Sequence, residues 1–337
     1  MSPTTIAAFV VVVAFAFMLG VSDAPNASAS LIASRATSYR GAMAFSFVAH
    51  VAGGLVAGQA VALTMRSLVH LPASDLPGAY LAGGVASLAF TLVATRHGVP
   101  VSASIALVGG LAGAAAVEAG WSAVGWGGLH GFHPYGVIGT LLAIVLSPVL
   151  GGLAAAGIRR VLARVLRRGA RDLARPLEGA IWLTAGLVGL ADGSNDGQKA
   201  MGLATALLVS SGTIRSFVVP YWVTALVAVT LAAGTASGGR RIVRTVSSRF
   251  YRGGPLDGLA AESASALTIL AAGWLGAPVS TSTVVASGMI GVGAARRRHH
   301  VHWPTVRTVV SAWVVTVPAC ALLGGALTEL GRAAVGR

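Results

Sequence analysis

The sequence is poor in charge, in aromatic side chains and in cysteine. Charged residues make up 10% of the 337 residues and aromatic residues 6%, whereas hydrophobic residues make up 55%. A chain with so few charges and a mean hydropathy of +0.78 cannot cover a water-soluble core with polar surface, so a bilayer must act as its solvent. The single cysteine, Cys320, excludes a disulfide framework and a thiolate metal site.

Acidic residues and lysine are also scarce, and the formal net charge of +14 comes almost entirely from arginine. The arginines lie between the apolar stretches: seven from Arg159 to Arg175, five from Arg240 to Arg252, and four from Arg296 to Arg307. This placement is typical of cytoplasmic loops that contact anionic membrane lipid, and it argues against a nucleic-acid partner.

Ten apolar segments are long enough to cross a bilayer at about 20 residues per crossing. They lie near residues 5–33, 42–64, 78–95, 98–117, 134–158, 177–213, 216–237, 258–276, 278–294 and 305–330. The sequence therefore predicts an all-α polytopic membrane protein with about 10 to 12 transmembrane segments. Helical hairpins that re-enter without crossing would change this count.

The arginine clusters also predict the orientation of the two halves. If the basic linker is cytoplasmic, an odd number of crossings in each half places the other clusters in the cytoplasm as well. The halves are then inverted repeats, a common plan among secondary transporters. We expect a first transmembrane repeat at 1–158, a basic cytoplasmic linker at 159–176 and a second, inverted repeat at 177–337, with both termini outside a cell membrane.

The first pair of repeated motifs centres on an aspartate. GVSDAPNA at 20–27 matches GSNDGQKA at 193–200, which places Asp23 opposite Asp196. A proline and two glycines interrupt these apolar runs, so both helices are predicted to break at mid-membrane. Carboxylates at that depth are costly and usually functional. We interpret Asp23 and Asp196, together with Glu262, as ligands for a coupling sodium ion or proton.

The second pair of motifs is rich in hydroxyl groups. PVSASIALVGGLAG from residue 100 matches PVSTSTVVASGMIG from residue 278. Free amides at a helix N-terminus and neighbouring hydroxyls suit a small oxyanion. The hydroxyl-bearing candidates are Ser102, Ser104, Ser280, Thr281 and Ser282.

These residues also have simpler interpretations. An aspartate can cap a half-helix, and serine is an ordinary residue where membrane helices pack. Lys199, the only lysine of the chain, follows the second aspartate motif inside an apolar stretch. It is either a partner for the anion or an ion-pair partner of Asp192 or Asp196.

Both pairs of motifs resemble those of the inorganic phosphate transporter (PiT) family. GSNDGQKAMG is similar to the family pattern GSNDVQKAMG, and GVSDAPNA to GANDxANA. The segments from residues 100 and 278 resemble PSSSSHALIGG and PVSTTH, and Glu262 falls where the family carries a glutamate. The resemblance covers both halves. It implies phosphate symport driven by a sodium or proton gradient, a homodimer, no cofactor and no enzymatic activity.

The same resemblance implies a site between the two repeats. By motif position it comprises Asn26, Ser102, Ser104, Asn195, Ser280, Thr281 and Ser282 for the substrate, with Asp23 and Asp196. To these we add Lys199 as a substrate ligand and Glu262 as a ligand of the coupling ion.

Several positions depart from the family patterns. Ser22 replaces an asparagine, and Ile105 and Thr283 stand where the family has histidines. These changes leave a sulfate permease of the same family as an alternative. A passive channel and an intramembrane enzyme with Asp23 and Asp196 as a catalytic dyad are further alternatives.

Overall fold

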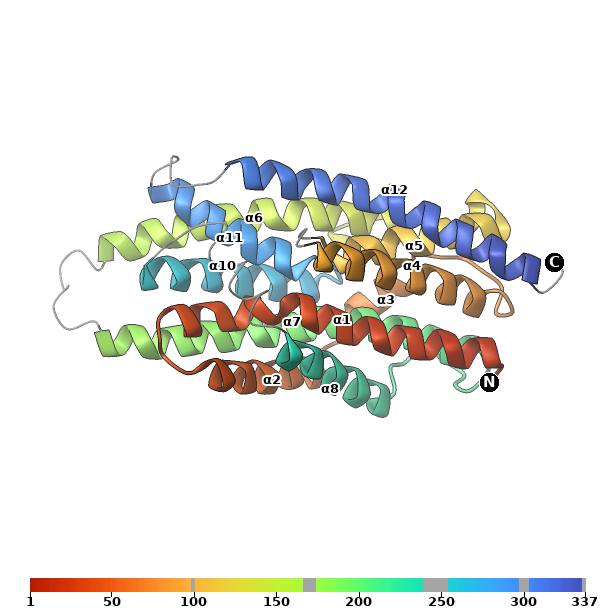
Figure 1. The fold of residues 1–337 in the computed structure, drawn as a ribbon, viewed down its shortest axis with the longest axis horizontal. Coiled ribbons are helices and arrows are strands. Elements are labelled where there is room, and N and C mark those ends of the chain that lie inside the picture. The colour runs from red at the N-terminus through yellow and green to blue at the C-terminus, as the bar shows by residue number, and fades with distance from the viewer. Residues whose placement is uncertain (98–100, 166–173, 239–253, 297–302, 335–337) are drawn as a thin grey trace.

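The structure, a computed structural model, describes residues 1–97, 101–165, 174–238, 254–296 and 303–334. It is an elongated helical bundle (Figure 1). Four of its helices have 30 or more residues and run along the long axis. They are α1 (Pro3–Ala33), α6 (Gly136–Val165), α7 (Ala174–Ser210) and α12 (Trp303–Ala334).

Seven shorter α-helices complete the described bundle. They are α2 (Tyr39–Leu55), α3 (Ala60–Arg66), α4 (Leu76–Arg96), α5 (Ala103–Ala119), α8 (Tyr221–Ser237), α10 (Pro255–Trp274) and α11 (Thr281–Arg296). A short 3-10 helix, η1 (Trp121–Ala123), precedes an antiparallel hairpin of β1 (Gly128–His130) and β2 (His133–Tyr135). Each of the ten predicted segments corresponds to helix, although the segment at 42–64 bends by 75° between α2 and α3.

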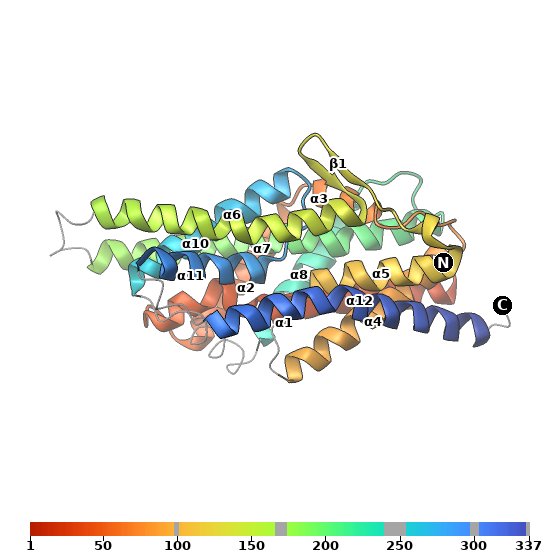
Figure 2. The same ribbon diagram turned by 90° about the horizontal axis from the view of Figure 1, so that it is seen from above.

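Two helical hairpins enter the molecule from opposite ends (Figures 1 and 2). The pair α4 and α5 occupies the half that bears both termini, and the pair α10 and α11 occupies the other half. The N-terminal ends of α5 and α11 meet near the middle of the long axis, where Lys199 contacts both. These two helix starts, with the described residues just before them, are called the hairpin tips. Apolar length alone predicts each of these four helices as a separate crossing, because hydropathy measures the length of an apolar helix and not the direction in which the chain returns.

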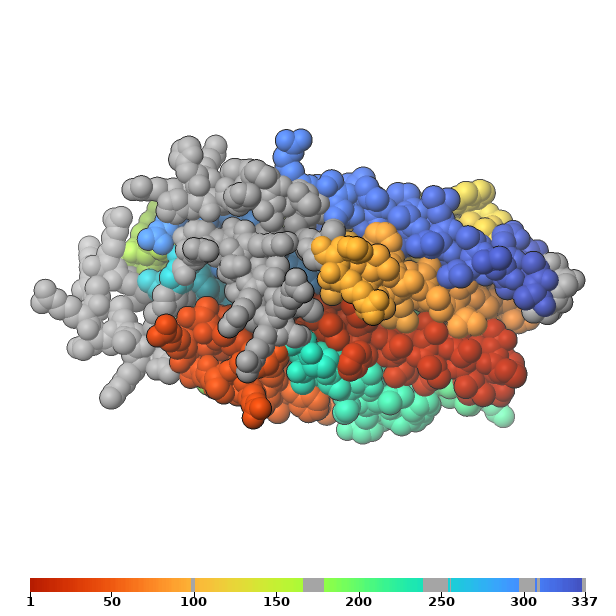
Figure 3. Space-filling model, viewed as in Figure 1, coloured from red at the N-terminus to blue at the C-terminus, as the bar shows by residue number. Residues whose placement is uncertain are grey.

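Packing interlocks the two halves of the chain. Each hairpin packs against the last helix of the other half: α4 and α5 against α12, and α10 and α11 against α6. The first helices are exchanged in the same way, because α1 packs against α8 and α2 against α7. On the face in Figure 3, α1, α4 and α12 lie side by side. The main apolar cluster of the described residues contains side chains from both halves.

The helices do not break at the aspartate motifs, which corrects a sequence-based expectation. α1 continues through Pro25, and α7 continues through Gly193 and Gly197. A proline removes one backbone donor, and packed neighbours support the rest of such a helix inside a membrane. The glycines serve close packing instead, since Gly193 lies against the backbone of His50 in α2. The breaks fall just before α5 and α11, in the hydroxyl-rich segments.

The outer surface of the bundle suits a bilayer. Four helices are long and apolar enough to cross a membrane, or five if α2 and α3 form one bent span, counting described residues only. The helix α6 exposes a stripe of large apolar side chains: Leu142, Val145, Leu146, Val149, Leu150 and Leu153. Water would not favour such a surface, whereas lipid chains would.

The basic regions fall largely outside the described residues. The predicted linker begins inside α6, which continues to Val165, and its last residues belong to α7. Residues 166–173 between these helices, the whole cluster at 240–252, and Arg297 and Arg298 lie outside the described part of the chain.

Candidate functional site

Polar side chains from α1 and α7 form a buried network at the middle of the molecule. Asn26 joins the two helices, because its amide nitrogen donates to Asp23 Oδ1 (3.0 Å) and to Asp192 Oδ2 (2.9 Å). Adjacent residues of α11 link Asp23 to Asp196, because Ser282 donates to Asp23 and Thr281 donates to Asp196. Asn26 and the three aspartates are at most 4% exposed. The two repeated aspartate motifs therefore meet in one site.

Lys199 lies at the centre of this network with an exposure of 0%. Its ammonium group forms an ion pair with Asp196, donates to Ser104 Oγ (2.8 Å) and donates to the backbone carbonyl of Val279. Ser104 belongs to α5 and Val279 precedes α11, so one side chain of α7 contacts the tips of both hairpins. An ammonium group has three donors, and all three are used.

The second hairpin tip is fixed by α7 and α1 together. Asn195 Nδ2 donates to the carbonyl of Ala277 (3.0 Å), and Asn195 Oδ1 accepts from the amide of Val279 (3.3 Å). Thr281 donates to Asp196 Oδ2 (3.0 Å), and Ser282 donates to Asp23 Oδ1 (2.5 Å). The first turn of α11 thus contacts the aspartates of both motifs.

The two hydroxyl-rich segments start helices at this point. Ser102 Oγ accepts from the amide of Ile105 (3.3 Å) and so caps the N-terminus of α5. Ser280 is buried directly before α11, and its carbonyl accepts from Thr283 and Val284. The N-termini of α5 and α11 therefore both begin beside the carboxylate network, as an oxyanion site would require.

Most of the predicted site residues come together, but Glu262 does not. Glu262 in α10 accepts from Thr184 Oγ1 (2.6 Å), and Thr184 precedes Asp196 on α7 by 12 residues, or roughly 18 Å of helix. The residues in or beside the network are Asp23, Asn26, Ser102, Ser104, Asn195, Asp196, Lys199, Ser280, Thr281 and Ser282.

Sequence reasoning missed His50. This side chain of α2 is 0% exposed; its Nδ1 hydrogen-bonds the carbonyl of Ser46 (2.7 Å) and its Nε2 lies 4.0 Å from Asp192 Oδ2. Within the described residues, His50 Nε2 and Asp192 Oδ1 have no hydrogen-bond partner. An ionisable residue inside the apolar segment at 42–64 was the available signal.

The electrostatic balance of the network is negative. Asp23, Asp192 and Asp196 face the single cation Lys199, so two negative charges are in excess when all three carboxylates are ionised. Buried charges need partners, so the network can hold cations or protons. Among the described residues, no group of three or more His, Cys, Asp or Glu side chains is arranged to hold a metal ion.

The profile of the phosphate transporter family matches residues 19–177 and again residues 171–324. The chain belongs to the phosphate transporter family. The double match agrees with the two copies of each motif. Membership of a transporter family removes the aspartyl-enzyme alternative, and a sulfate permease is not favoured.

Relatives within the phosphate transporter family match nearly the whole chain. A "Probable low-affinity inorganic phosphate transporter" of Rhizobium meliloti (strain 1021) is 34% identical, covering 95% of this chain and 94% of the relative. A protein of Bacillus subtilis (strain 168) with the same description is 30% identical, and the match covers 95% of this chain and 95% of the relative. A solved structure titled "The sodium-dependent phosphate transporter" superposes with a TM-score of 0.87 at 22% identity, over 98% of this chain and 99% of that one. The predicted fold class is confirmed.

Proposed function

We propose that this protein imports inorganic phosphate and couples the import to a gradient of sodium ions or protons. One observation carries the proposal: the tips of two opposed hairpins converge on a buried network supplied by both aspartate motifs. A secondary transporter needs such a site at the interface of its repeats, reachable from either side in turn. The descriptions of the relatives in the phosphate transporter family support phosphate as the substrate.

The coupling cation follows from the charge of the network. Phosphate brings further negative charge to a place where carboxylates already outnumber the single lysine. Cations that bind at Asp23 and Asp196 would neutralise both the network and the substrate. We assign these two aspartates to the coupling ion. Glu262 keeps this role only as a prediction, because it lies apart from them.

The proposed ligands of the anion lie at the two hairpin tips. The N-termini of α5 and α11 supply amide dipoles, and Ser104, Thr281 and Ser282 supply hydroxyl groups. Lys199 already donates to three protein acceptors, so an anion must exchange with one of them to bind the ammonium group. The remaining proposed substrate ligands are Asn26, Ser102, Asn195 and Ser280.

We further propose the larger organisation that the sequence predicts. The repeats would comprise 1–158 and 177–337, joined by a cytoplasmic linker at 159–176, with both termini outside the cell membrane. The exchange of packing partners between the halves supports this division. A homodimer in the lipid bilayer is proposed from the family resemblance, and cross-linking in native membranes would test it.

Uptake of labelled phosphate into proteoliposomes tests the function. The purified protein is given a sodium gradient, a proton gradient or no gradient, with excess unlabelled sulfate as competitor. We expect accumulation against the phosphate gradient with one of the two cations and little inhibition by sulfate. If sulfate blocks the accumulation, sulfate becomes the favoured substrate. If labelled phosphate equilibrates across the membrane without accumulating, the protein is a passive channel.

The variant Asp196→Asn tests the role assigned to the network. We expect coupled uptake to fall by on the order of 100-fold, because the neutral side chain loses both a cation ligand and the charge facing Lys199. The matched control is Glu329→Gln, which removes a carboxylate that is 65% exposed on α12. Near wild-type uptake by a folded Asp196→Asn protein would contradict the assignment.

A further inference from the structure

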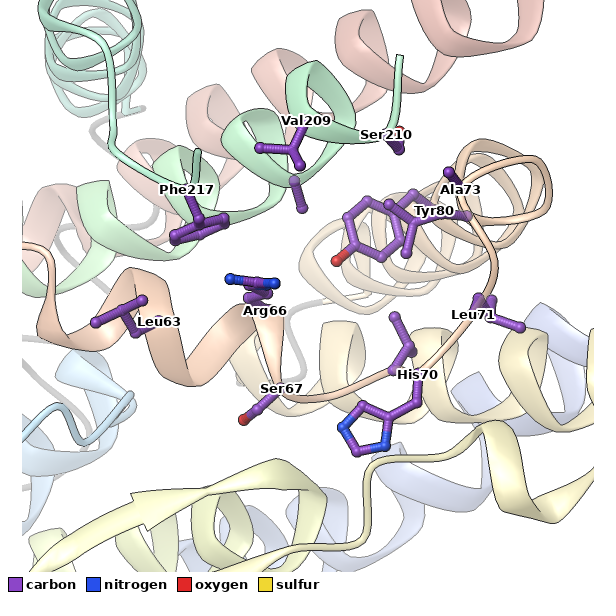
Figure 4. A pocket seen from close by; sticks show the side chains of 13 residues that line it. Leu63, Arg66, Ser67, His70, Leu71, Ala73, Tyr80, Val209, Ser210 and Phe217 are labelled. Atoms are coloured by element: carbon purple, nitrogen blue, oxygen red, sulfur yellow. The ribbon is translucent and has the colours of Figure 1, made fainter. Parts of the chain in front are cut away.

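A cavity of about 630 Å³ lies away from the central network, toward the end of the molecule that bears the termini. It is bounded by α3, the segment that leads into α4, the C-terminal end of α7 and Phe217 beyond it (Figure 4). Among the described residues that line it, none is an aspartate or a glutamate. The cavity therefore has a cation, Arg66, without an acid in its wall.

Arg66 is oriented for an anion. Its guanidinium group lies over the ring of Phe217, with 5.0 Å between Cζ and the ring centroid. Stacking of this kind fixes the plane of the guanidinium group and leaves its N–H edges free for a planar or tetrahedral oxyanion. Arg66 takes part in none of the ion pairs found among the described residues. Its charge is therefore available to a ligand.

Tyr80 supplies a second, independent indication. This residue of α4 is 1% exposed, and within the described part of the chain its hydroxyl group has no hydrogen-bond partner. Figure 4 shows the hydroxyl group and the Arg66 guanidinium group facing each other across the cavity, whereas the ring of His70 points away. A buried hydroxyl group without a partner is unfavourable, so an acceptor between Tyr80 and Arg66 would satisfy both.

The cavity is separate from the central network but lies along the same helix. Ala206 and Val209 line it, and they follow Lys199 on α7 by two to three turns, or roughly 10–15 Å. Between the two places, Met65, Met201 and Leu203 belong to one buried apolar cluster. An ion in the cavity would therefore sit outside a packed apolar layer that separates it from the carboxylates.

We propose that this cavity binds a small oxyanion, inorganic phosphate first, between the Arg66 guanidinium group and the Tyr80 hydroxyl group. The site serves as a docking position ahead of the central network, and this role rests on the proposed transport of phosphate. Binding here concentrates the substrate at the end of the molecule where the termini lie, and the central site then takes it up when the apolar layer opens.

Transport kinetics test the docking role. We expect Arg66→Gln to raise the KM for phosphate on the order of tenfold and Tyr80→Phe about threefold, with the maximal rate unchanged at saturating phosphate. The matched control is Arg215→Gln, which removes an exposed charge near Phe217 that does not line the cavity. An equal rise in KM for Arg66→Gln and Arg215→Gln would mean general electrostatic attraction and overturn the proposal, as would an unchanged KM for Arg66→Gln.

A binding measurement separates this site from transport. Cys320 is buried, so Ser210→Cys places one accessible thiol at the cavity wall. We expect phosphate to slow labelling of that thiol by an anionic methanethiosulfonate reagent, both alone and together with Asp196→Asn or Arg215→Gln, but not together with Arg66→Gln. Size-exclusion elution verifies the fold of each variant.

The two experiments distinguish failure of the docking site from failure of the proposed transport. Protection of the thiol in a protein that does not accumulate phosphate would keep the oxyanion site and refute the proposed transport. Accumulation without protection, or protection that survives Arg66→Gln, would refute the site and leave the transport proposal intact.

Discussion

The Lys199 ammonium group and the Asp196 carboxylate form an ion pair that is fully buried. Removing one member of such a pair leaves an uncompensated charge, which typically costs about 3–5 kcal/mol, whereas removing both costs much less. We expect Lys199→Met to lower the free energy of unfolding by about that amount. The double variant Lys199→Met with Asp196→Asn should recover most of the loss.

Thermal unfolding of the three proteins in detergent, Lys199→Met, Asp196→Asn and the double variant, measures this coupling. If the stability loss of the double variant equals the sum of the two single losses, the residues do not interact directly. Stability changes add for independent residues and do not add for residues in contact. The double variant is expected to remain inactive in uptake, because stability and the coupling-ion site depend on the same two side chains.

Asn195 holds the tip of the second hairpin through two backbone hydrogen bonds, to Ala277 and Val279. Asn195→Ala should lose about 1–3 kcal/mol of stabilisation of the tip and reduce uptake on the order of tenfold. Ser194→Ala is the control on the preceding residue, because the Ser194 carbonyl that accepts from Gln198 is retained. Equal uptake by the two variants would show that the tip does not depend on the Asn195 side chain.

Residues of the network could be predicted from the sequence where a motif repeats. Asp23 and Asp196 stand out as ionisable residues in apolar segments at matching positions. The repeated motifs that contain them also predict the polar residues next to them in the network. His50 belongs to no repeated motif, so its place beside Asp192 required the packing of α2 on α7. The position of Glu262 depends on how α10 packs against α7, which residue type cannot give.

Glycines of the aspartate motifs determine how closely the helices approach. A methyl group at Gly20 would overlap the backbone of Leu231 in α8, and one at Gly193 would overlap the backbone of His50 in α2. We expect Gly20→Ala and Gly193→Ala each to destabilise the fold by about 1–3 kcal/mol, because backbone cannot yield as a flexible side chain does. The two positions should behave alike, since they correspond in the two motifs.

Gly157→Ala in α6 is the matched control for these variants. No atom lies within 4 Å of a methyl group at that position, so the change should be neutral or slightly stabilising for the helix. The yield of monodisperse protein after detergent extraction, followed by thermal unfolding, gives the comparison. A Gly193→Ala protein as stable as Gly157→Ala would contradict tight packing of α7 on α2.

At the level of elements, apolar length was sufficient to find the helices and insufficient to find their breaks. Proline and glycine weaken an isolated helix, which is why the sequence predicts breaks at the aspartate motifs. The surrounding helices outweigh that local preference, so α1 and α7 stay continuous. The breaks before α5 and α11 arise where each hairpin turns back, and that turn depends on the contacts of its tip with α7.

The whole molecule combines two interlocked halves, and the adjoining ends of α6 and α7 lie opposite the termini. α6 ends and α7 begins at one end of the long axis, and the N- and C-termini both lie at the other (Figures 1 and 2). If the long axis crosses the membrane, as we propose, the termini and the α6–α7 end of the bundle face opposite sides of it. By the positive-inside rule, the arginines near the C-terminal end of α6 predict that this end faces the cytoplasm.

This orientation can be measured with single cysteines, because the native Cys320 is buried and should not react. Ser2→Cys and Ala334→Cys at the termini are expected to react with a membrane-impermeant maleimide on intact cells, since both positions are exposed. Arg164→Cys, exposed near the end of α6, should react only after permeabilisation. Labelling of Arg164→Cys on intact cells together with protection of both termini would reverse the orientation. Labelling of only one terminus would contradict the fold itself, because the two termini share one end of the bundle.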